Sequence, residues 1–234
     1  MNQNQIISVR PERWAFVLLL ITQIIFVALT PIINGSSFGR WVRLFALFAI
    51  LISGVYAASV RKGFLVVALF LMLPALFAWL GPDLLSPNIA EVSRLLSAAA
   101  CFTFTAVVVS TAVVKHENVT AETIIGGIDA YLLIGLTFML LHMAVLIGNP
   151  GAYDLGGQPM KEFLISGREF HGFSTMLYFS FTTLTTLGYG DIVPKTSWAR
   201  LLTSAEAVIG QLYVAIFIAR LVSLQVSQRM TRRK

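Results

Sequence analysis

The residues best suited to chemistry form one run, residues 185–191, with the order Thr-Thr-Leu-Gly-Tyr-Gly-Asp. Glycine recurs at alternate positions, Gly188 and Gly190, and glycine adopts positive φ angles without steric cost. A backbone of this kind can aim successive carbonyl oxygens at one axis. Several copies of such a loop could then replace the water shell of a dehydrated K⁺ ion. The run therefore predicts an ion-coordinating loop built from backbone oxygens.

The side chains of this loop have separate expected roles. Thr186 can add a hydroxyl at the inner end of the carbonyl row. Asp191 would place a carboxylate at the outer mouth, where it raises the local cation concentration. Leu187 and Tyr189 must point away from the ion, and we expect them to brace the loop against aromatic residues of the preceding segment, Tyr178, Phe179 and Phe181.

Residues 183–191 closely resemble the signature of the K⁺ channel superfamily, usually written T-x-x-T-V-G-Y-G-D. Leu187 replaces the usual valine, but its carbonyl would face the ion, so selectivity should survive. Thr182 stands where some relatives have a glutamate that bonds to the filter aspartate. The resemblance covers roughly residues 124–226, because further residues have spacings similar to those of bacterial two-helix pores: Pro194, Trp198, Arg200 and Gly210.

The resemblance implies a fourfold homotetramer with a selectivity filter at its extracellular end. The filter would bind K⁺ at Thr186, Leu187, Gly188 and Tyr189, with Gly190 completing the loop. Gly210 matches a glycine that acts as a gating hinge in that family, although plain helix packing remains an alternative. The inner pore is expected to be lined by Ile218, Ala219 and Val222.

Composition indicates an integral membrane protein. The chain has 234 residues, of which 57% are hydrophobic and only 12% charged, and its mean hydropathy is +0.80. A soluble domain of this size could not bury so much apolar surface. The net charge of +6 comes from basic residues in short loops and at the C-terminal end, which favours cytosolic lipid headgroups over nucleic acid as the partner.

Apolar length predicts an all-α membrane protein with six transmembrane helices. A seventh apolar segment, residues 170–184, is too short to span and predicts a re-entrant pore helix that leads into the selectivity-filter loop. The six spanning helices are expected at residues 14–33, 41–60, 63–80, 92–114, 124–147 and 199–226.

Polar breaks divide the chain into five expected parts. They are a cytosolic tail at 1–13, a four-helix membrane domain at 14–114, an interfacial linker at 115–123, a pore domain at 124–226 and a basic cytosolic tail at 227–234. An even number of spans places both termini on one side. The positive-inside rule leans toward the cytosol for that side of a multi-pass protein of the cell membrane.

The first four helices resemble the layout of voltage-gated channels, but the fourth lacks their basic ladder. Residues 92–114 contain one arginine, Arg94. Moving one charge across 100 mV is worth only about 2.3 kcal/mol, so steep voltage dependence needs several charges per subunit. We therefore expect a voltage-insensitive channel. Because the chain stops soon after the sixth helix, gating would come from the membrane domain, lipid, pH, ions or an unknown regulatory partner.

The other charged residues in apolar segments have simpler expected roles. Arg43, Arg94 and Asp129 lie near helix ends and are expected to snorkel toward headgroups. His142 is expected to be a packed core residue. Two readings stay open for Glu206, a hydrogen bond to the pore helix or a structural role away from lipid.

A helical membrane protein could instead have one of two other functions. A nonconducting or weakly selective subunit would keep the fold, although the intact filter argues against it. An intramembrane hydrolase would need a nucleophile, a base and an orienting group, and only Ser174 beside His171 comes near. No G-x-S-x-G motif is present, so the chain is not expected to be an enzyme or to bind an organic cofactor.

Overall fold

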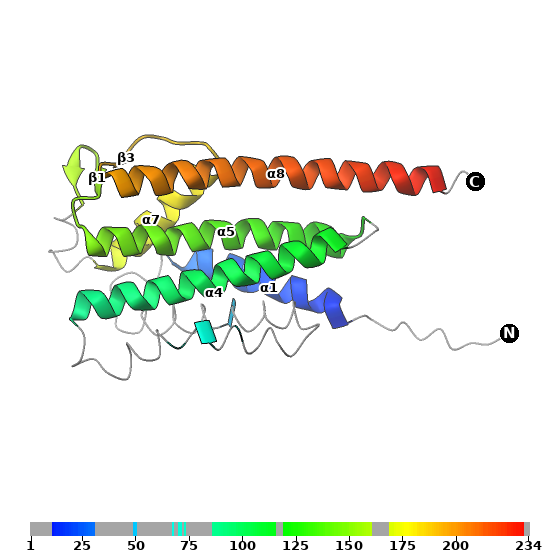
Figure 1. Ribbon diagram of the computed structural model, residues 1–234, viewed down its shortest axis with the longest axis horizontal. Coiled ribbons are helices and arrows are strands. Elements are labelled where there is room, and N and C mark those ends of the chain that lie inside the picture. Colours follow the sequence, from blue (N-terminus) through cyan, green and yellow to red (C-terminus); the bar gives the residue numbers. More distant parts are fainter. Residues whose placement is uncertain are drawn as a thin grey trace.

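The computed structural model describes residues 11–30, 49–50, 67, 70–71, 73, 86–115, 119–160 and 169–231. Most of these residues are helical (Figure 1). The helices are α1 (Pro11–Leu29), α4 (Pro87–Lys115), α5 (Ala121–Gly148), α7 (Glu169–Leu184) and α8 (Ser197–Thr231). Three short strands accompany them, β1 (Tyr153–Leu155), β2 (Gln158–Pro159) and β3 (Ile192–Pro194).

Local chemistry explains where the long helices begin. α4 starts with Pro87, whose fixed φ suits the first helical position and whose missing N–H is not needed there. α5 is capped by Thr120, whose hydroxyl accepts a hydrogen bond from the Thr123 N–H at 3.3 Å. α8 is capped in the same way by Thr196, which accepts from the Ala199 N–H at 3.3 Å.

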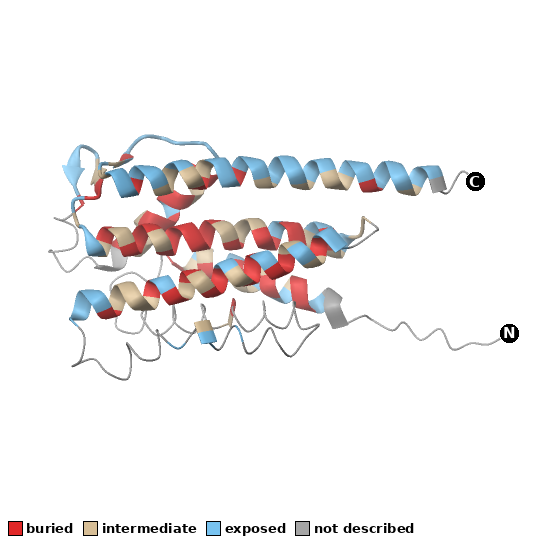
Figure 2. Cartoon of the chain, viewed as in Figure 1, coloured by how far each residue is buried: buried red, intermediate tan, exposed pale blue. Residues whose placement is uncertain are grey.

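α5 is the centre of the described bundle. α4 runs alongside it, and α1, α7 and α8 also contact it (Figure 1). Its side chains are buried over most of its length (Figure 2). Its completely buried side chains include Leu133, Leu136, Met139 and Leu140. The burial of this apolar helix against its neighbours fixes the position of its carboxyl end, which leads into β1 and β2.

α8 contrasts with α5, because much of its surface is exposed in the single chain (Figure 2). Its exposed side chains are largely apolar, and they include Leu201, Val208, Leu212, Ile216, Ile218 and Val222. An apolar helix face of this length requires lipid or another protein surface to cover it.

Three described helices are long and apolar enough to cross a membrane: Pro87–Lys115, Ala121–Gly148 and Ser197–Met230. A shorter apolar helix occupies Trp14–Leu29. The protein is therefore a membrane protein with several apolar helices. The start of α1 and the end of α8 lie toward the same end of the bundle, opposite the strands (Figure 1).

The strands form a three-stranded antiparallel sheet in the order β2-β1-β3. β1 and β2 make a hairpin after α5, and β3 pairs with β1 in the register Tyr153↔Pro194, Asp154↔Val193 and Leu155↔Ile192. Lys195 Nζ lies 2.8 Å from Asp154 Oδ2 beside this pairing. The all-α prediction did not include this sheet. Its pairing joins segments almost forty residues apart, which no local pattern signals.

The helices expected at 14–33, 92–114, 124–147, 170–184 and 199–226 correspond to α1, α4, α5, α7 and α8, with ends that differ by a few residues. The helices expected at 41–60 and 63–80 lie outside the described residues except for isolated positions, as do Arg43 and most of the N-terminal tail. The six-span count and the five-part division therefore remain predictions.

Candidate cation-coordinating site

The last turn of α7 holds the loop that follows it. The Thr186 N–H donates to the Thr183 carbonyl at 2.9 Å. The Thr182 carbonyl accepts two hydrogen bonds, from the Leu187 N–H at 2.8 Å and from the Gly188 N–H at 3.1 Å. The loop is thus folded back onto the carboxyl end of a helix, where the helix dipole is partially negative and favours a cation.

The backbone φ angles of this loop alternate in sign. Positive φ angles occur at Thr186 (59°), Gly188 (52°) and Gly190 (77°), whereas Leu187 and Tyr189 between them are not in that region. A Cβ at either glycine would meet no atom within 4 Å, so the φ angle is the reason for glycine there. This agrees with the role predicted for the two glycines.

Thr186 extends the alternation by one residue, which the sequence did not indicate. A β-branched residue at positive φ costs on the order of 1–3 kcal/mol and persists only where surrounding contacts hold it. Here the Thr186 N–H bonds to Thr183, and its hydroxyl donates to the Thr185 carbonyl at 2.7 Å. The available signal was spacing alone, since Thr186 lies two residues before Gly188.

Fewer aromatic residues contact the loop than the sequence predicts. The rings of Tyr178 and Tyr189 are stacked, with centroids 6.3 Å apart and an interplanar angle of 7°. Phe179 instead contacts His142, with centroids 4.9 Å apart, and the Phe181 ring lies against Gly135 of α5. Only Tyr178 of the three predicted aromatic residues therefore makes a ring contact with the loop. Its neighbours on α7 face the bundle because successive helix positions point in different directions.

The outer end of the loop is fastened to the hairpin. The Asp191 carbonyl accepts a hydrogen bond from the Gly156 N–H at 2.9 Å, and the β3 strand that follows pairs with β1. The exposed Asp191 side chain also has a hydrogen bond to Tyr178 on α7. Tyr178 thus provides a contact from α7 to the aspartate, although Thr182 does not carry the glutamate found in some K⁺ channels.

The inner end of the loop touches α8. Gln211 Nε2 donates to Thr186 Oγ1 at 3.2 Å. Beside it, Gly210 packs so closely that a Cβ would lie 2.3 Å from the Leu184 carbonyl oxygen. Gly210 is therefore a close-packing site, and its role as a hinge stays a prediction. Sequence reasoning missed Gln211, for which adjacency to Gly210 was the available signal.

The three residues expected to line the inner pore lie on the same side of α8 as Gln211. Helical spacing places Ile218 and Val222 two and three turns below Gln211, with Ala219 beside them. All three side chains are exposed in the single chain. Their role in the pore stays a prediction.

Glu206 makes the pore-helix contact that was one of its two open readings. Glu206 Oε1 is hydrogen-bonded to Ser180 Oγ on α7 at 2.5 Å, and its Oε2 lies 2.8 Å from His142 Nε2 on α5. The other ring nitrogen of His142 lies 2.7 Å from the Tyr153 hydroxyl on β1. His142 is fully buried, as expected for a packed core residue, but it also joins polar groups of two other elements.

The burial of Asp129 contradicts its predicted role, whereas the snorkelling of Arg94 stays a prediction. Asp129 is fully buried on α5 instead of snorkelling, and neither carboxyl oxygen has a hydrogen-bond partner among the described residues. The burial follows from packing, because α1, α4 and α8 all contact α5. Arg94 forms an ion pair with Glu91 one turn earlier on α4, so its charge is locally compensated.

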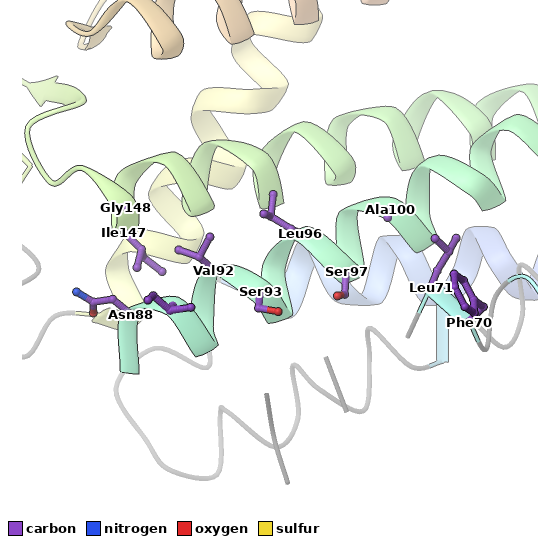
Figure 3. Close-up of a pocket in the computed structure, with 11 residues that line it drawn as sticks. Phe70, Leu71, Asn88, Val92, Ser93, Leu96, Ser97, Ala100, Ile147 and Gly148 are labelled. Carbon is purple, nitrogen blue, oxygen red and sulfur yellow. The ribbon is translucent and has the colours of Figure 1, made fainter. Parts of the chain in front are cut away.

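An apolar pocket of about 730 Å³ lies between α4 and the carboxyl end of α5, and no residue of the loop lines it (Figure 3). No ionisable side chain is among its lining residues, which does not suit ion coordination. They are Phe70, Leu71, Asn88, Ile89, Val92, Ser93, Leu96, Ser97, Ala100, Ile147 and Gly148. The serine considered for hydrolysis, Ser174, lies within α7, and the His171 side chain is outside the described part of the chain.

Residues 151–226 match the ion channel family model. This region is an ion-channel pore domain. The match begins at the hairpin and continues through α7, the loop, β3 and most of α8, so it contains every contact of the loop described above. It identifies an ion channel family rather than a class of enzyme.

Curated potassium channels resemble the pore domain at a distance. Two pore potassium channel a of Oryza sativa subsp. japonica is 33% identical over 94 residues, which are 40% of this chain and 25% of the relative. Two-pore potassium channel 1 of Arabidopsis thaliana is 38% identical over 82 residues, or 35% of this chain and 21% of the relative. A voltage-gated delayed rectifier potassium channel of Homo sapiens is 33% identical over 84 residues, or 33% of this chain and 8% of the relative.

The chain thus spans a quarter or less of the length of these relatives. No solved structure matches it. The comparisons thus show that residues 151–226 are an ion-channel pore domain with potassium channels among its distant relatives.

Proposed function

We propose that the protein is a K⁺-selective channel that conducts K⁺ passively across the cell membrane. The observation that carries the proposal is the alternation of positive φ at Thr186, Gly188 and Gly190 within a region that matches ion channels. Alternation of this kind lets consecutive carbonyls face one side, as a dehydrated cation requires. The relatives' own names, all potassium channels, favour K⁺ over other cations.

K⁺ ions bind in the filter at Thr186, Leu187, Gly188 and Tyr189, through main-chain carbonyls and the Thr186 hydroxyl. The carboxyl end of α7 adds a favourable dipole at the inner end. Asp191 attracts cations at the outer mouth. No organic cofactor takes part, because conduction needs only coordination and release of the ion.

The channel is a homotetramer. One loop supplies a quarter of a coordinating ring, so four copies around one axis are needed to surround the ion. Support comes from the exposed apolar surface of α8 and from the exposed side chains of Leu187 and Tyr189, which neighbouring subunits and lipid would cover.

Both termini are cytosolic, and the hairpin and filter face the exterior. The arrangement of α1 and α8 supports this topology, because the start of one and the end of the other lie away from the filter (Figure 1). The inner pore is then lined by Ile218, Ala219 and Val222, which lie below Gln211. Gly210 is the gating hinge, and in this structure it is closely packed against Leu184 of α7.

The central experiment is radiotracer flux from proteoliposomes under a K⁺ gradient, with Na⁺ substituted in a parallel arm. We expect K⁺ flux that greatly exceeds Na⁺ flux. Gly188→Ala should abolish it, because alanine cannot hold the positive φ without strain. Gly157→Ala is the matched control, since Gly157 also has positive φ (83°) and open space but lies in the hairpin.

Each outcome is informative. Absent K⁺ flux would favour a nonconducting subunit, and equal K⁺ and Na⁺ flux a weakly selective one, and both would overturn the proposal. Unchanged flux in Gly188→Ala would overturn the assigned filter. Loss of flux in both alanine variants would show that the effect is structural rather than specific to the filter.

A further inference from the structure

We propose that Tyr153, His142, Glu206 and Ser180 form one directional hydrogen-bond chain, with Glu206 as a neutral carboxylic acid, and that this chain positions the pore helix for K⁺ selectivity. The proposal rests on the proposed function for its link to selectivity, but its protonation claim can be tested without conduction. These four residues are positioning residues, because none of them contacts the ion.

The hydrogen-bond chain crosses the whole pore domain in four contacts. The Tyr153 hydroxyl lies 2.7 Å from His142 Nδ1, and His142 Nε2 lies 2.8 Å from Glu206 Oε2. Glu206 Oε1 lies 2.5 Å from Ser180 Oγ, which lies 2.7 Å from the Gly135 carbonyl oxygen. All four side-chain residues are completely buried. The chain therefore joins the hairpin, α5, α8 and α7 in a place that water does not reach.

The number of available protons determines which group donates in each hydrogen bond of this network. The Gly135 carbonyl can only accept, so the single Ser180 proton goes to it. The contact between Ser180 and Glu206 then needs a proton from Glu206, which must be a carboxylic acid. His142 with its proton on Nε2 donates to the other oxygen of Glu206, and Tyr153 donates to His142 Nδ1. Four protons serve four contacts, and no net charge is buried.

An ionised Glu206 does not satisfy the same contacts. The one Ser180 proton would have to serve both the Gly135 carbonyl and Glu206 Oε1, so one close oxygen pair would have no hydrogen between them. An ionised carboxylate would also be held away from water, and among the described residues only His142 lies close enough to serve as its counter-ion. The titratable groups that face Glu206 are His142 and Tyr131 from α5 and Tyr153 from β1.

The hydrogen-bond chain is linked to the filter through α7. Ser180 lies two residues before Thr182, whose carbonyl holds the Leu187 and Gly188 N–H groups. Phe179, next to Ser180, packs against both His142 and Tyr153, with centroid distances of 4.9 Å and 5.5 Å. A shift of α7 at Ser180 would therefore move the Thr182 carbonyl and the oxygens of the filter with it.

The first experiment compares K⁺ and Na⁺ flux in three variants at Glu206 and Ser180. Glu206→Gln should keep the K⁺/Na⁺ flux ratio within about twofold, because an amide accepts from His142 and donates to Ser180 as the neutral acid does. Glu206→Leu and Ser180→Ala should lower the ratio by about tenfold or more, because α7 loses its link to α8. If the K⁺/Na⁺ flux ratio falls as far in Glu206→Gln as in Glu206→Leu, the proposal of a neutral hydrogen-bond chain is overturned.

Thr137→Ala is the matched control for Ser180→Ala. Thr137 is also a buried hydroxyl, but it donates to Leu133 within its own helix at 2.8 Å, so its removal breaks no link between elements. Its flux ratio should equal that of the wild type. Equal ratios in Ser180→Ala and Thr137→Ala would overturn the positioning role.

The second experiment is independent of conduction and of the folding of Glu206→Leu. Infrared spectra of the purified wild type and Glu206→Gln are subtracted at neutral pH. The difference should contain the band of a protonated carboxyl, and a carboxylate band in its place would overturn the proposal. If the wild type conducts no K⁺ but shows the protonated band, the proposed function fails while the neutral chain stands.

Discussion

Gly210 of α8 lies directly against Leu184 at the end of α7. A Cβ at position 210 would lie 2.3 Å from the Leu184 carbonyl oxygen and 3.2 Å from its carbonyl carbon. Both are backbone atoms, so no rotamer change can make room. This approach brings the next residue, Gln211, within hydrogen-bonding distance of the Thr186 hydroxyl. The contact between the two helices thus adjoins the loop that we propose as the filter.

Gly210→Ala should destabilise the protein, because α7 or α8 must move to admit the methyl group. We expect a loss of about 1–3 kcal/mol of stability, measured as a lower melting temperature of the purified channel in detergent. Gly148→Ala is the control, since Gly148 is also helical but has nothing within 4 Å of its Cβ position. A Gly210→Ala variant as stable as Gly148→Ala would favour the hinge over close packing.

Gln211→Ala should weaken K⁺ conduction while the protein stays folded. The substitution removes the donor that orients the Thr186 hydroxyl, so we expect K⁺ flux to fall by about threefold to tenfold with the outer filter intact. Flux is measured in proteoliposomes over a range of K⁺ concentrations. Gln225→Ala, at an exposed glutamine of the same helix, should leave flux unchanged. Equal fluxes in the two variants would contradict a role for Gln211 at the inner site.

Asp129→Leu should stabilise the protein. The Asp129 carboxyl is fully buried on α5, and neither of its oxygens has a partner within the described residues. Replacing such a group with an apolar side chain of similar size is expected to gain about 1–3 kcal/mol. Thermal unfolding measures the change. A lower melting temperature would mean that Asp129 has a partner which the single chain does not contain.

Asp154→Asn serves as the control for that measurement. Asp154 pairs with the half-exposed Lys195 at 2.8 Å in the outer sheet. Surface pairs contribute only about 0–1 kcal/mol, so this substitution should change stability slightly and in the opposite direction.

The conductance–voltage relation should be shallow. Arg94 is the one arginine in α4, and its charge is compensated by Glu91 on the same helix. One charge that crosses the whole of a 100 mV potential contributes only about 2.3 kcal/mol. Planar-bilayer currents between −100 and +100 mV, on the order of physiological potentials, provide the test. A curve as steep as that of voltage-gated channels, and flattened by Arg94→Gln, would refute the prediction.

Local patterns gave correct predictions where the cause was local. The apolar length of residues 124–147 and 199–226 located α5 and α8, because a helix buried in lipid or protein needs a continuous apolar run. The alternate glycines at 188 and 190 indicated positive φ, because the absence of a Cβ is a property of the residue itself. These features were sufficient to identify the loop and the helices on either side.

The structural features that the sequence did not predict share one cause, which is contact between residues far apart in the sequence. Thr186 adopts positive φ because the end of α7 holds the loop, not because threonine prefers it. Asp129 was expected at a lipid headgroup, but the packing of neighbouring helices buries it. The pairing of β1 with β3 was not foreseen, because their residues carry no marked strand pattern.

The sequence alone determined that this is a membrane protein and predicted a cation-coordinating loop, because apolar length and glycine spacing act over a few residues. Only the tertiary structure decided what holds that loop in place. Glu206 and His142 are 64 residues apart in the chain, yet they lie 2.8 Å apart behind the pore helix. The direction in which a helix faces depends on all the helices packed against it, and for that reason no spacing in the sequence could reveal this contact.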